Sequence, residues 1–157
     1  NIVFVLFDAE DLGGIDGLDF SIGADFYATR GKIRPDLVLV LDMVGGKDMH
    51  LSVDLNSLAV SPAAKVFNTL FTLGRALGYS SFFHNRTSMI ICDHFPFIQR
   101  GIPGLILIDI HYPQWHTQED TIEHCCRESL FQTGDVLFRY LTDVYHFDSI
   151  RKDIKKI

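Results

Sequence analysis

Short apolar runs alternate with helix-like segments along this chain. Three runs are rich in β-branched and aromatic residues and too short for helices, which is typical of strands buried on both faces: residues 2–7, 37–42 and 102–110. A weaker alternation over residues 49–55 predicts a strand at the sheet edge. Because strands and helices alternate, the pattern predicts an α/β fold with a mostly parallel sheet and helices on both faces.

Two longer segments have helical spacing. Residues 61–77 begin with Ser61 as N-cap and Pro62 in the first turn and are followed by Gly78; their apolar positions are Val66, Leu70, Leu73 and Leu77. Residues 130–145 predict a closing amphipathic helix whose inward face consists of Leu130, Val136, Leu137, Leu141 and Val144. Ser21, after a glycine-rich loop, is the predicted N-cap of a further helix.

Length and composition favour one folded domain. The chain has 157 residues, of which 47% are hydrophobic and 22% charged. A chain of this size can bury a core, and this composition excludes disordered, collagen-like and coiled-coil proteins. The longest apolar runs are far shorter than the about 20 residues that cross a bilayer, so we expect no membrane span. We therefore expect a single domain over residues 1–157.

The charge pattern makes the chain an unsuitable partner for nucleic acid. Its formal net charge is −6, and the first 25 residues contain six acidic residues and no Lys or Arg. An acidic protein repels phosphate backbones. The cysteines Cys92, Cys125 and Cys126 are odd in number and lack a metal-type spacing, so they leave the redox compartment open.

Polar residues follow the predicted strands. Asp8, Glu10 and Asp11 come after the first strand, Asp42 ends the second, and His116 follows the third. In parallel sheets, ligands bind beyond the carboxyl ends of the strands. We therefore expect most of these side chains to converge on one edge of the sheet.

Two of these groups suit a divalent metal site. Adjacent Glu10 and Asp11 could divide the work, with Asp11 as a ligand and Glu10 free to hold a proton. His116 lies beside Trp115 and close to Asp120, which could accept the second imidazole N–H. The alternatives are a solvated acidic loop or weak calcium site for the carboxylates, and an ordinary surface histidine for His116.

Four sequence blocks, in order, resemble the zinc aminopeptidase and glutaminyl cyclase superfamily, and most closely its bacterial cyclase-like members. The blocks are Phe-Asp-Ala-Glu-Asp at 7–11, Leu-Asp-Met-Val-Gly at 41–45, Asp-His-Phe-Pro-Phe at 93–97 with Gly-Ile-Pro at 101–103, and Trp-His-Thr at 115–117 with Asp-Thr at 120–121. The resemblance implies a three-layer αβα, zinc exopeptidase-like fold with a mostly parallel mixed sheet. It also implies zinc as the cofactor.

The resemblance implies a role for particular residues. The implied catalytic residues are Glu10 as general acid/base, Asp42 and Asp93. The implied zinc ligands are Asp11, His116 and, for a second metal, Asp42. The implied substrate pocket consists of Trp115, Tyr112, Phe95 and Cys92. For Asp93 and His94 the alternative is a helix N-cap and a structural histidine.

The resemblance also implies an activity. We expect a zinc-dependent enzyme that acts on the N-terminus of a peptide or small protein and cyclises glutamine, since about a dozen residues separate Asp11 from Gly23 as in the cyclases. An aminopeptidase is the alternative, because Cys92 stands where the cyclases carry an acid. A non-catalytic binding module is a third. The family has a further His and Asp upstream of residue 7, so we expect this chain to be the C-terminal portion of a longer protein. Oligomeric state stays open, and the family favours export to the periplasm or the extracellular space.

Overall fold

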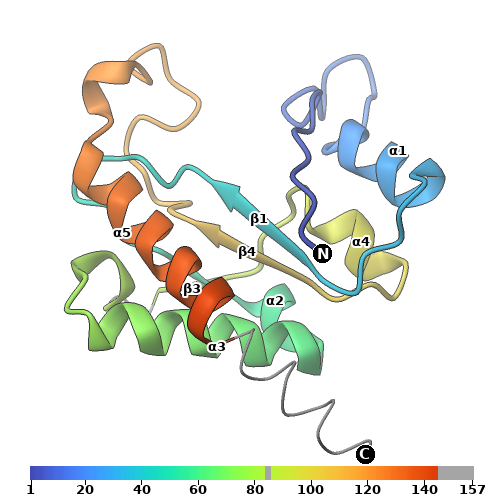
Figure 1. The fold of residues 1–157 in the computed structure, drawn as a ribbon. Helices are drawn as coiled ribbons and strands as arrows, with labels where there is room; N and C mark the ends of the chain where they lie inside the picture. The colour runs from blue at the N-terminus through green and yellow to red at the C-terminus, as the bar shows by residue number, and fades with distance from the viewer. Residues whose placement is uncertain (84–85, 145–157) are drawn as a thin grey trace, which may run out of the picture. The chain divides into compact units, whose positions relative to one another are not determined.

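The computed structural model describes residues 1–83 and 86–144. Its helices are α1 (Ile22–Arg30), α2 (Leu55–Ala59), α3 (Ser61–Ala76), α4 (Phe95–Gln99) and α5 (Arg127–Arg139), and its strands are β1 (Val38–Asp42), β2 (Val53–Asp54), β3 (Thr87–Ser88) and β4 (Gly104–Ile108) (Figure 1). Short 3₁₀ turns occur at Ser80–Phe82 and Ile122–His124, and a π-helical turn, Tyr140–Val144, follows α5.

The strands pair in parallel. β2 pairs with β3 in the register Val53 to Thr87 and Asp54 to Ser88. β1 is the neighbour of β4, and Figure 1 shows their arrows pointing in the same direction. The predicted α/β class with parallel strands is confirmed.

The described residues form two compact units. The first unit comprises Asn1–Leu41, Val53–Lys65 and Thr87–Leu107; the second comprises Asp42–Ser52, Val66–Arg86 and the described chain from Ile108 onward.

An aromatic cluster forms the core of the first unit. Ala24, Phe97 and Ile102 are buried there, and Phe7 and Tyr27 pack against them. The Phe7 and Phe97 ring centroids lie 6.0 Å apart, and the Phe7 and Tyr27 centroids 5.8 Å apart. These separations are those of favourable aromatic pairs, so the cluster joins α1, α4 and the segment before α1.

A second aromatic cluster lies under α3 in the second unit. The Phe67 and Phe71 rings stack at 4.5 Å, and Phe82 packs edge-on against Phe71 at 5.5 Å. Phe82 also covers Gly74, where an added Cβ would overlap its ring. The space for the Phe82 ring therefore depends on the absence of a side chain at position 74.

Most predicted elements are confirmed, with altered limits. Three of the predicted elements become β1, α3 and β4, and Ser21 precedes α1, although its side chain makes no capping hydrogen bond. Of residues 49–55, only Val53–Asp54 forms a strand. The buried stripe of α3 is Ala63, Phe67, Leu70 and Phe71. It differs from the prediction because apolar residues flank the stripe on both sides, so that periodicity alone does not locate its centre.

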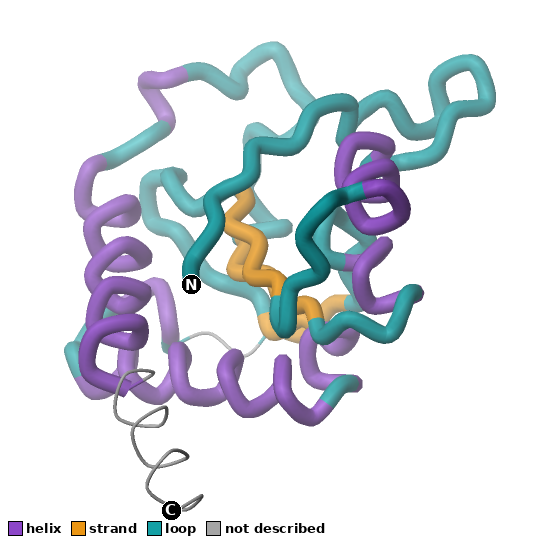
Figure 2. Tube along the Cα trace, turned by 45° about the vertical axis from the view of Figure 1, so that its right-hand side comes forward, coloured by secondary structure: helices purple, strands orange, loops and turns teal. Residues whose placement is uncertain are grey.

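Two predictions are wrong. Residues 2–7 form no strand, and Figure 2 shows this segment as loop; Phe4 is 91% and Leu6 100% exposed. A strand requires a neighbour that accepts and donates backbone hydrogen bonds, and the described residues supply none for this segment. Leu130, predicted to face inward together with Val136, is 53% exposed, because the buried side of α5 consists of Ser129, Thr133 and Val136. The end of the predicted helix at Tyr145 lies outside the described residues.

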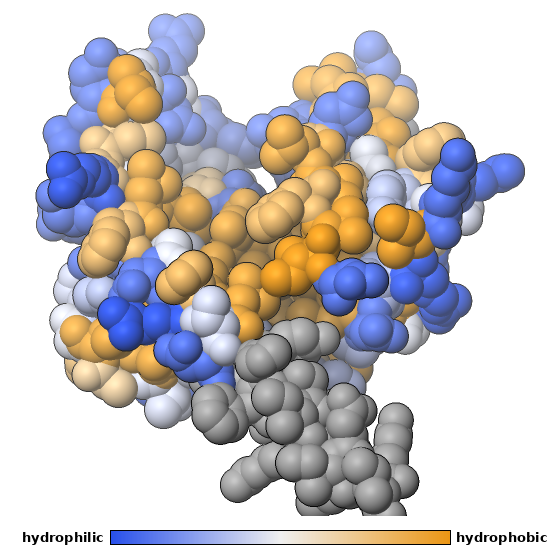
Figure 3. All heavy atoms as spheres, viewed as in Figure 1, coloured by the Kyte–Doolittle hydropathy of each residue, from blue (hydrophilic) through white to orange (hydrophobic). Residues whose placement is uncertain are grey.

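Exposed apolar side chains contribute visibly to the face shown in Figure 3. Within residues 1–83 and 86–144, the helices are too short or too polar to cross a membrane.

Two helical glycines provide a test of the packing under α3. Gly74→Ala should lower the free energy of unfolding by about 1–3 kcal/mol, because the methyl group would displace the buried Phe82 ring. At Gly134 in α5, an added Cβ would stand in open space. Gly134→Ala should therefore raise the free energy of unfolding by about 0.5–1 kcal/mol, because alanine has the higher helix propensity. Urea unfolding measures both changes; equal effects of the two substitutions would refute the packing argument.

Candidate functional site

The predicted residues divide between the two units. Glu10, Asp11, Cys92, Asp93 and Phe95 belong to the first unit. Asp42, Tyr112, Trp115 and His116 belong to the second. The predicted residues thus fall into two sets, one in each unit.

In the first unit, the turn that carries Glu10 is tied to the start of α1. The Ser21 N–H donates to the Glu10 carbonyl at 3.1 Å, and the Gly23 N–H donates to the Asp8 carbonyl at 3.2 Å. A Cβ at Gly23 would overlap the backbone of Asp8, so only glycine permits this approach. These bonds leave the Glu10 side chain half-buried and the Asp11 side chain exposed.

Asp93 lies in a second part of the same unit, in the turn before α4. The turn is closed by the Phe95 N–H, which donates to the Cys92 carbonyl at 2.8 Å. Cys92 and His94 are buried, whereas Asp93 is half-buried. His94 is therefore buried inside the unit, and it, rather than Asp93, is the N-cap residue of α4, without a capping hydrogen bond from its side chain.

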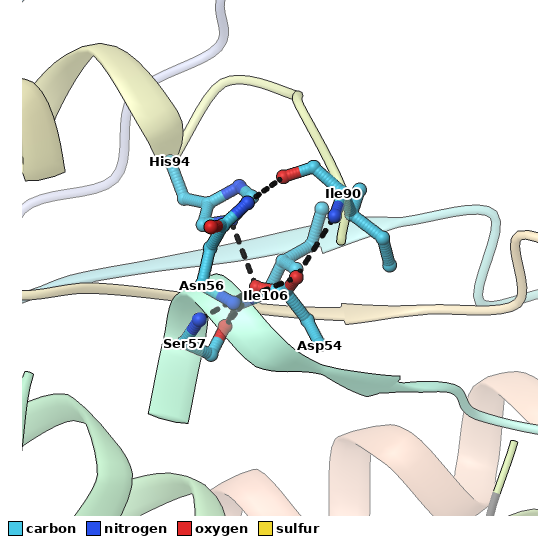
Figure 4. A network of polar contacts seen from close by, with 6 residues as sticks. All are labelled: Asp54, Asn56, Ser57, Ile90, His94 and Ile106. Carbon is cyan, nitrogen blue, oxygen red and sulfur yellow. Dashed lines mark hydrogen bonds and ion pairs between the residues drawn. The ribbon is translucent and has the colours of Figure 1, made fainter. Parts of the chain in front are cut away.

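A buried carboxylate, Asp54, holds this region together (Figure 4). Its Oδ1 accepts from the N–H groups of Asn56 at 3.2 Å and Ile90 at 3.0 Å. Its Oδ2 accepts from the Ser57 N–H and hydroxyl, both at 2.7 Å, and lies 3.0 Å from Nε2 of His94. Asp54 is thus the N-cap of α2 and also the anchor of the segment before α4.

Hydrogen bonds determine the charge of Asp54. Burial alone raises the pKa of this carboxyl, but hydrogen bonds from His94, Ser57 and the backbone of Ile90 together outweigh burial, so its pKa lies below the ordinary value. Asp54 is therefore ionised at neutral pH.

In the second unit, Trp115 and His116 lie on a loop of tight turns. Their ring centroids are 4.4 Å apart. The Trp115 N–H donates to the Tyr112 carbonyl at 3.2 Å, and the Thr117 hydroxyl donates to the Gln114 carbonyl at 2.7 Å. His116 has a φ of 59°, in the left-handed region that non-glycine residues seldom adopt, and strained residues of this kind concentrate at functional sites.

A buried acid also anchors this loop. Asp109, 5% exposed, follows β4 and accepts from the N–H groups of His50 at 3.0 Å and His111 at 3.3 Å. These bonds fix the first residues of the loop to the segment before β2. Beside them lies a cavity of about 400 Å³, lined in part by Lys47, His50, Arg86 and Tyr112.

The turn after Asp42 is held against the segment that follows the same loop. The Lys47 N–H donates to the His124 carbonyl at 2.9 Å, and the Cys126 N–H donates to the Gly45 carbonyl at 2.8 Å. The buried Ser129 hydroxyl donates to the Gly46 carbonyl at 2.7 Å. Backbone hydrogen bonds therefore connect the turn after Asp42 with the segment that follows the His116 loop.

The side chain of Tyr112 is an uncharged phenol at neutral pH. Burial, and then the neighbouring Asp120 carboxylate, raise the pKa of its hydroxyl. The Tyr112 ring lies near Gly46, with its Cδ2 3.1 Å from where a Cβ would stand. The aromatic side chain is thus held by the glycine turn that follows Asp42.

The described residues do not complete a zinc site. Within residues 1–83 and 86–144, no three His, Cys, Asp or Glu side chains are arranged to hold a metal ion. The carboxylate of Asp11 and the imidazole of His116 are ligand types that zinc accepts, but two such ligands are fewer than a zinc site requires.

Comparison with known proteins identifies the family. The model of peptidase family M28 matches residues 1–141. The chain belongs to peptidase family M28. Aminopeptidase YwaD of Bacillus subtilis is 27% identical over 99% of this chain, which spans 34% of that protein.

Solved structures of the same kind share the fold. A Zn-dependent exopeptidase from Parabacteroides distasonis has a TM-score of 0.73 and 29% identity, and the glutaminyl cyclase of Porphyromonas gingivalis has a TM-score of 0.74 and 26% identity. The similarity covers 87% and 85% of this chain, respectively, and 52% of each solved chain. The chain thus spans about half the length of the solved relatives.

Asp54 and Asp109 were not among the residues singled out from the sequence. A signal was present for each. Asp54 precedes Ser57 by three positions at the start of a helix, which is an N-cap pattern. Asp109 is a single acid inside the apolar run 102–110.

Asp54 makes a testable contribution to stability. Asp54→Asn should lower the free energy of unfolding at pH 7 by about 2–4 kcal/mol, because an amide nitrogen replaces an acceptor and leaves buried donors unpaired. The folded-state pKa is lowered, so this stabilisation is present above about pH 4, the unfolded value, and is lost as the pH falls through the folded value. In urea unfolding, the difference in the free energy of unfolding between wild type and Asp54→Asn should therefore become smaller as the pH is lowered from about 5 to about 2.

Asp25→Asn is the matched control. Asp25 forms a partly exposed ion pair with Arg100 at 2.8 Å, so its loss should cost less than about 1 kcal/mol. A wild-type-to-Asp54→Asn difference that stayed constant from pH 5 to pH 2 would contradict the assigned charge.

Proposed function

We propose that the protein is a zinc-dependent enzyme that acts on peptide N-termini and converts N-terminal glutamine to pyroglutamate with release of ammonia. The observation that supports this most directly is the likeness of 85% of the chain to a solved glutaminyl cyclase. The contact between Trp115 and His116 adds support, because it sets an aromatic wall beside a proposed metal ligand.

In the proposed reaction, the α-amine of the substrate attacks the carbonyl carbon of its own side-chain amide. A C–N bond forms and closes the five-membered lactam, while the C–N bond to the amide nitrogen breaks. Glu10 accepts a proton from the attacking amine and returns it to the leaving ammonia. Asp42 steadies the leaving group, and Glu10 is half-buried in the turn before α1.

Asp11 and His116 are the proposed zinc ligands. Both side chains are exposed at turns in their units, where they can meet a metal ion. Since the described residues do not complete the donor set, the proposal places the remaining ligands outside them. The chain spans about half of the solved relatives, which leaves room for such ligands.

A zinc aminopeptidase is the second candidate. It is favoured by the likeness to YwaD over 99% of the chain and by Cys92 at a position where cyclases carry an acid. In this version Glu10 deprotonates a water molecule that attacks the carbonyl carbon of the first peptide bond, and the proton passes to the leaving amine as the C–N bond breaks. The two reactions share their proton-transfer group and differ in the nucleophile.

Substrate assays on the full-length protein decide between the candidates. Ammonia release from Gln-peptides is expected, whereas release of free amino acids from Leu-peptides would favour the aminopeptidase. Glu10→Gln should lower kcat at least about 100-fold, because a positioned general base contributes about 10²–10⁴-fold. Asp19→Asn, an exposed acid in the same segment, is the control and should leave kcat unchanged.

Zinc content tests the ligands separately from activity. Asp11→Asn and His116→Ala should each lower the zinc retained after gel filtration, measured by elemental mass spectrometry. His111→Ala, a nearby exposed histidine outside the proposed donor set, should not. Full zinc in both ligand variants would reject the assignment. A wild-type protein without zinc and without either activity would instead be a non-catalytic binding module.

A further inference from the structure

The segment from Ile90 to His94 is anchored at both ends by one side chain. At the first end, the Ile90 N–H donates to Oδ1 of Asp54 at 3.0 Å, and the Ile90 carbonyl accepts from the side chain of Asn56 at 2.8 Å. At the other end, Nε2 of His94 lies 3.0 Å from Oδ2 of Asp54. Figure 4 shows Asp54 with Ile90, His94 and the start of α2 gathered around it.

Asp93 lies inside this closed segment. It is the covalent neighbour of His94, so their Cα atoms are about 3.8 Å apart. The hydrogen bond from the Phe95 N–H to the Cys92 carbonyl closes a turn around it. Because Cys92 and His94 are both buried, the segment cannot rotate without exposing one of them, and the position of the Asp93 backbone follows from the anchors.

The bond to Asp54 is the principal polar contact of His94. The side chain is 0% exposed, and its Nδ1 has no hydrogen-bond partner among the residues that the structure describes. An unpaired buried nitrogen costs free energy, so packing alone would favour an apolar side chain. The histidine is therefore explained by the bond that Nε2 makes.

Asp54 is too deeply buried to contact a substrate. It is 0% exposed, and its hydrogen bonds go to α2, to the segment before α4 and, through Ser57, to β4. The Ile106 N–H donates to the Ser57 hydroxyl at 3.1 Å, while that hydroxyl donates to Asp54. Asp54 can therefore influence a reaction only through the residues that it holds.

We propose that Asp54 and His94 are positioning residues that fix the Asp93 carboxylate in the reactive site. The proposal rests on the proposed function and on the catalytic role that the family resemblance implies for Asp93. Asp54 and His94 would thus act on the reaction without touching the substrate.

The first test is a double-mutant cycle in the full-length, zinc-loaded enzyme. Asp54→Asn should lower kcat about 10-fold or more with KM changed less than about 2-fold, because misplacement of a reacting group by about 1 Å costs up to about 100-fold. The double variant Asp54→Asn/Asp93→Asn should be no slower than Asp93→Asn alone. Asp25→Asn, in the same unit, should keep the wild-type kcat. If the fold-decrease in kcat of the double variant equals the product of the fold-decreases of the two single variants, the proposal is overturned.

Hydrogen exchange gives a readout that does not depend on activity. Asp54→Asn should accelerate amide exchange in peptides that cover residues 88–97 and leave α1 protected. A uniform acceleration across both regions would show a general loss of stability and would overturn the positioning role.

A second pair of variants applies if Asp54→Asn does not fold. His94→Gln can still donate a hydrogen bond to Asp54 and should retain most of the wild-type kcat, whereas His94→Phe fills the space without the bond and should lower it about 10-fold. Equal rates for the two variants would contradict the proposal.

Failure of the proposed function is distinguishable from failure of this inference. If the wild-type protein acts on neither Gln-peptides nor Leu-peptides, the proposed function is wrong. The titration of the Asp93 carboxyl by ¹³C NMR then decides the positioning role. A titration midpoint that differs between wild type and His94→Phe supports it, and an unchanged midpoint rejects it.

Discussion

One buried carboxylate does in the first unit what a longer strand ladder does in other α/β proteins. β2 and β3 pair over only two residues each, too few to align the segments that follow them. Asp54 at the end of β2 supplies acceptors for the start of α2 and for the chain after β3. Because the same side chain meets donors from several directions, its charge is compensated despite complete burial. The local fold therefore depends on one ionised group that hydrogen bonds keep ionised.

The second unit repeats this principle at a different strand end. Asp109 follows β4 and accepts two backbone N–H groups, one from the segment before β2 and one from its own loop. Loops that carry reactive residues cannot rely on a strand ladder for their backbone partners. In this protein, buried aspartates accept hydrogen bonds from the backbone N–H groups of these segments. The irregular segments around Asp93 and Trp115 are therefore held in place without regular secondary structure.

Local pattern was sufficient for some parts of this fold but not for others. α3, β1 and β4 follow from spacing and from the residue types that each contains, because their signals lie within one segment. Residues 2–7 have the composition of a strand but no described neighbour to pair with, and composition cannot supply one. Asp54 was missed because its partners Ile90 and His94 lie 36 and 40 residues away. The roles of Glu10, Asp11 and His116 came from family resemblance, and they stay predictions.

The burial of Cys92 bears on the choice between the two reactions. Position 92 faces inward in the same segment as His94, at 4% exposure. A carboxylate there would need its own hydrogen-bond donors, whereas a thiol behaves as a small apolar group and is compatible with a buried site. The thiol therefore allows this segment to pack without a second buried charge near Asp54. A buried thiol at position 92 cannot take part in proton transfer as a carboxylate could, which is why Cys92 favours the aminopeptidase as the second candidate.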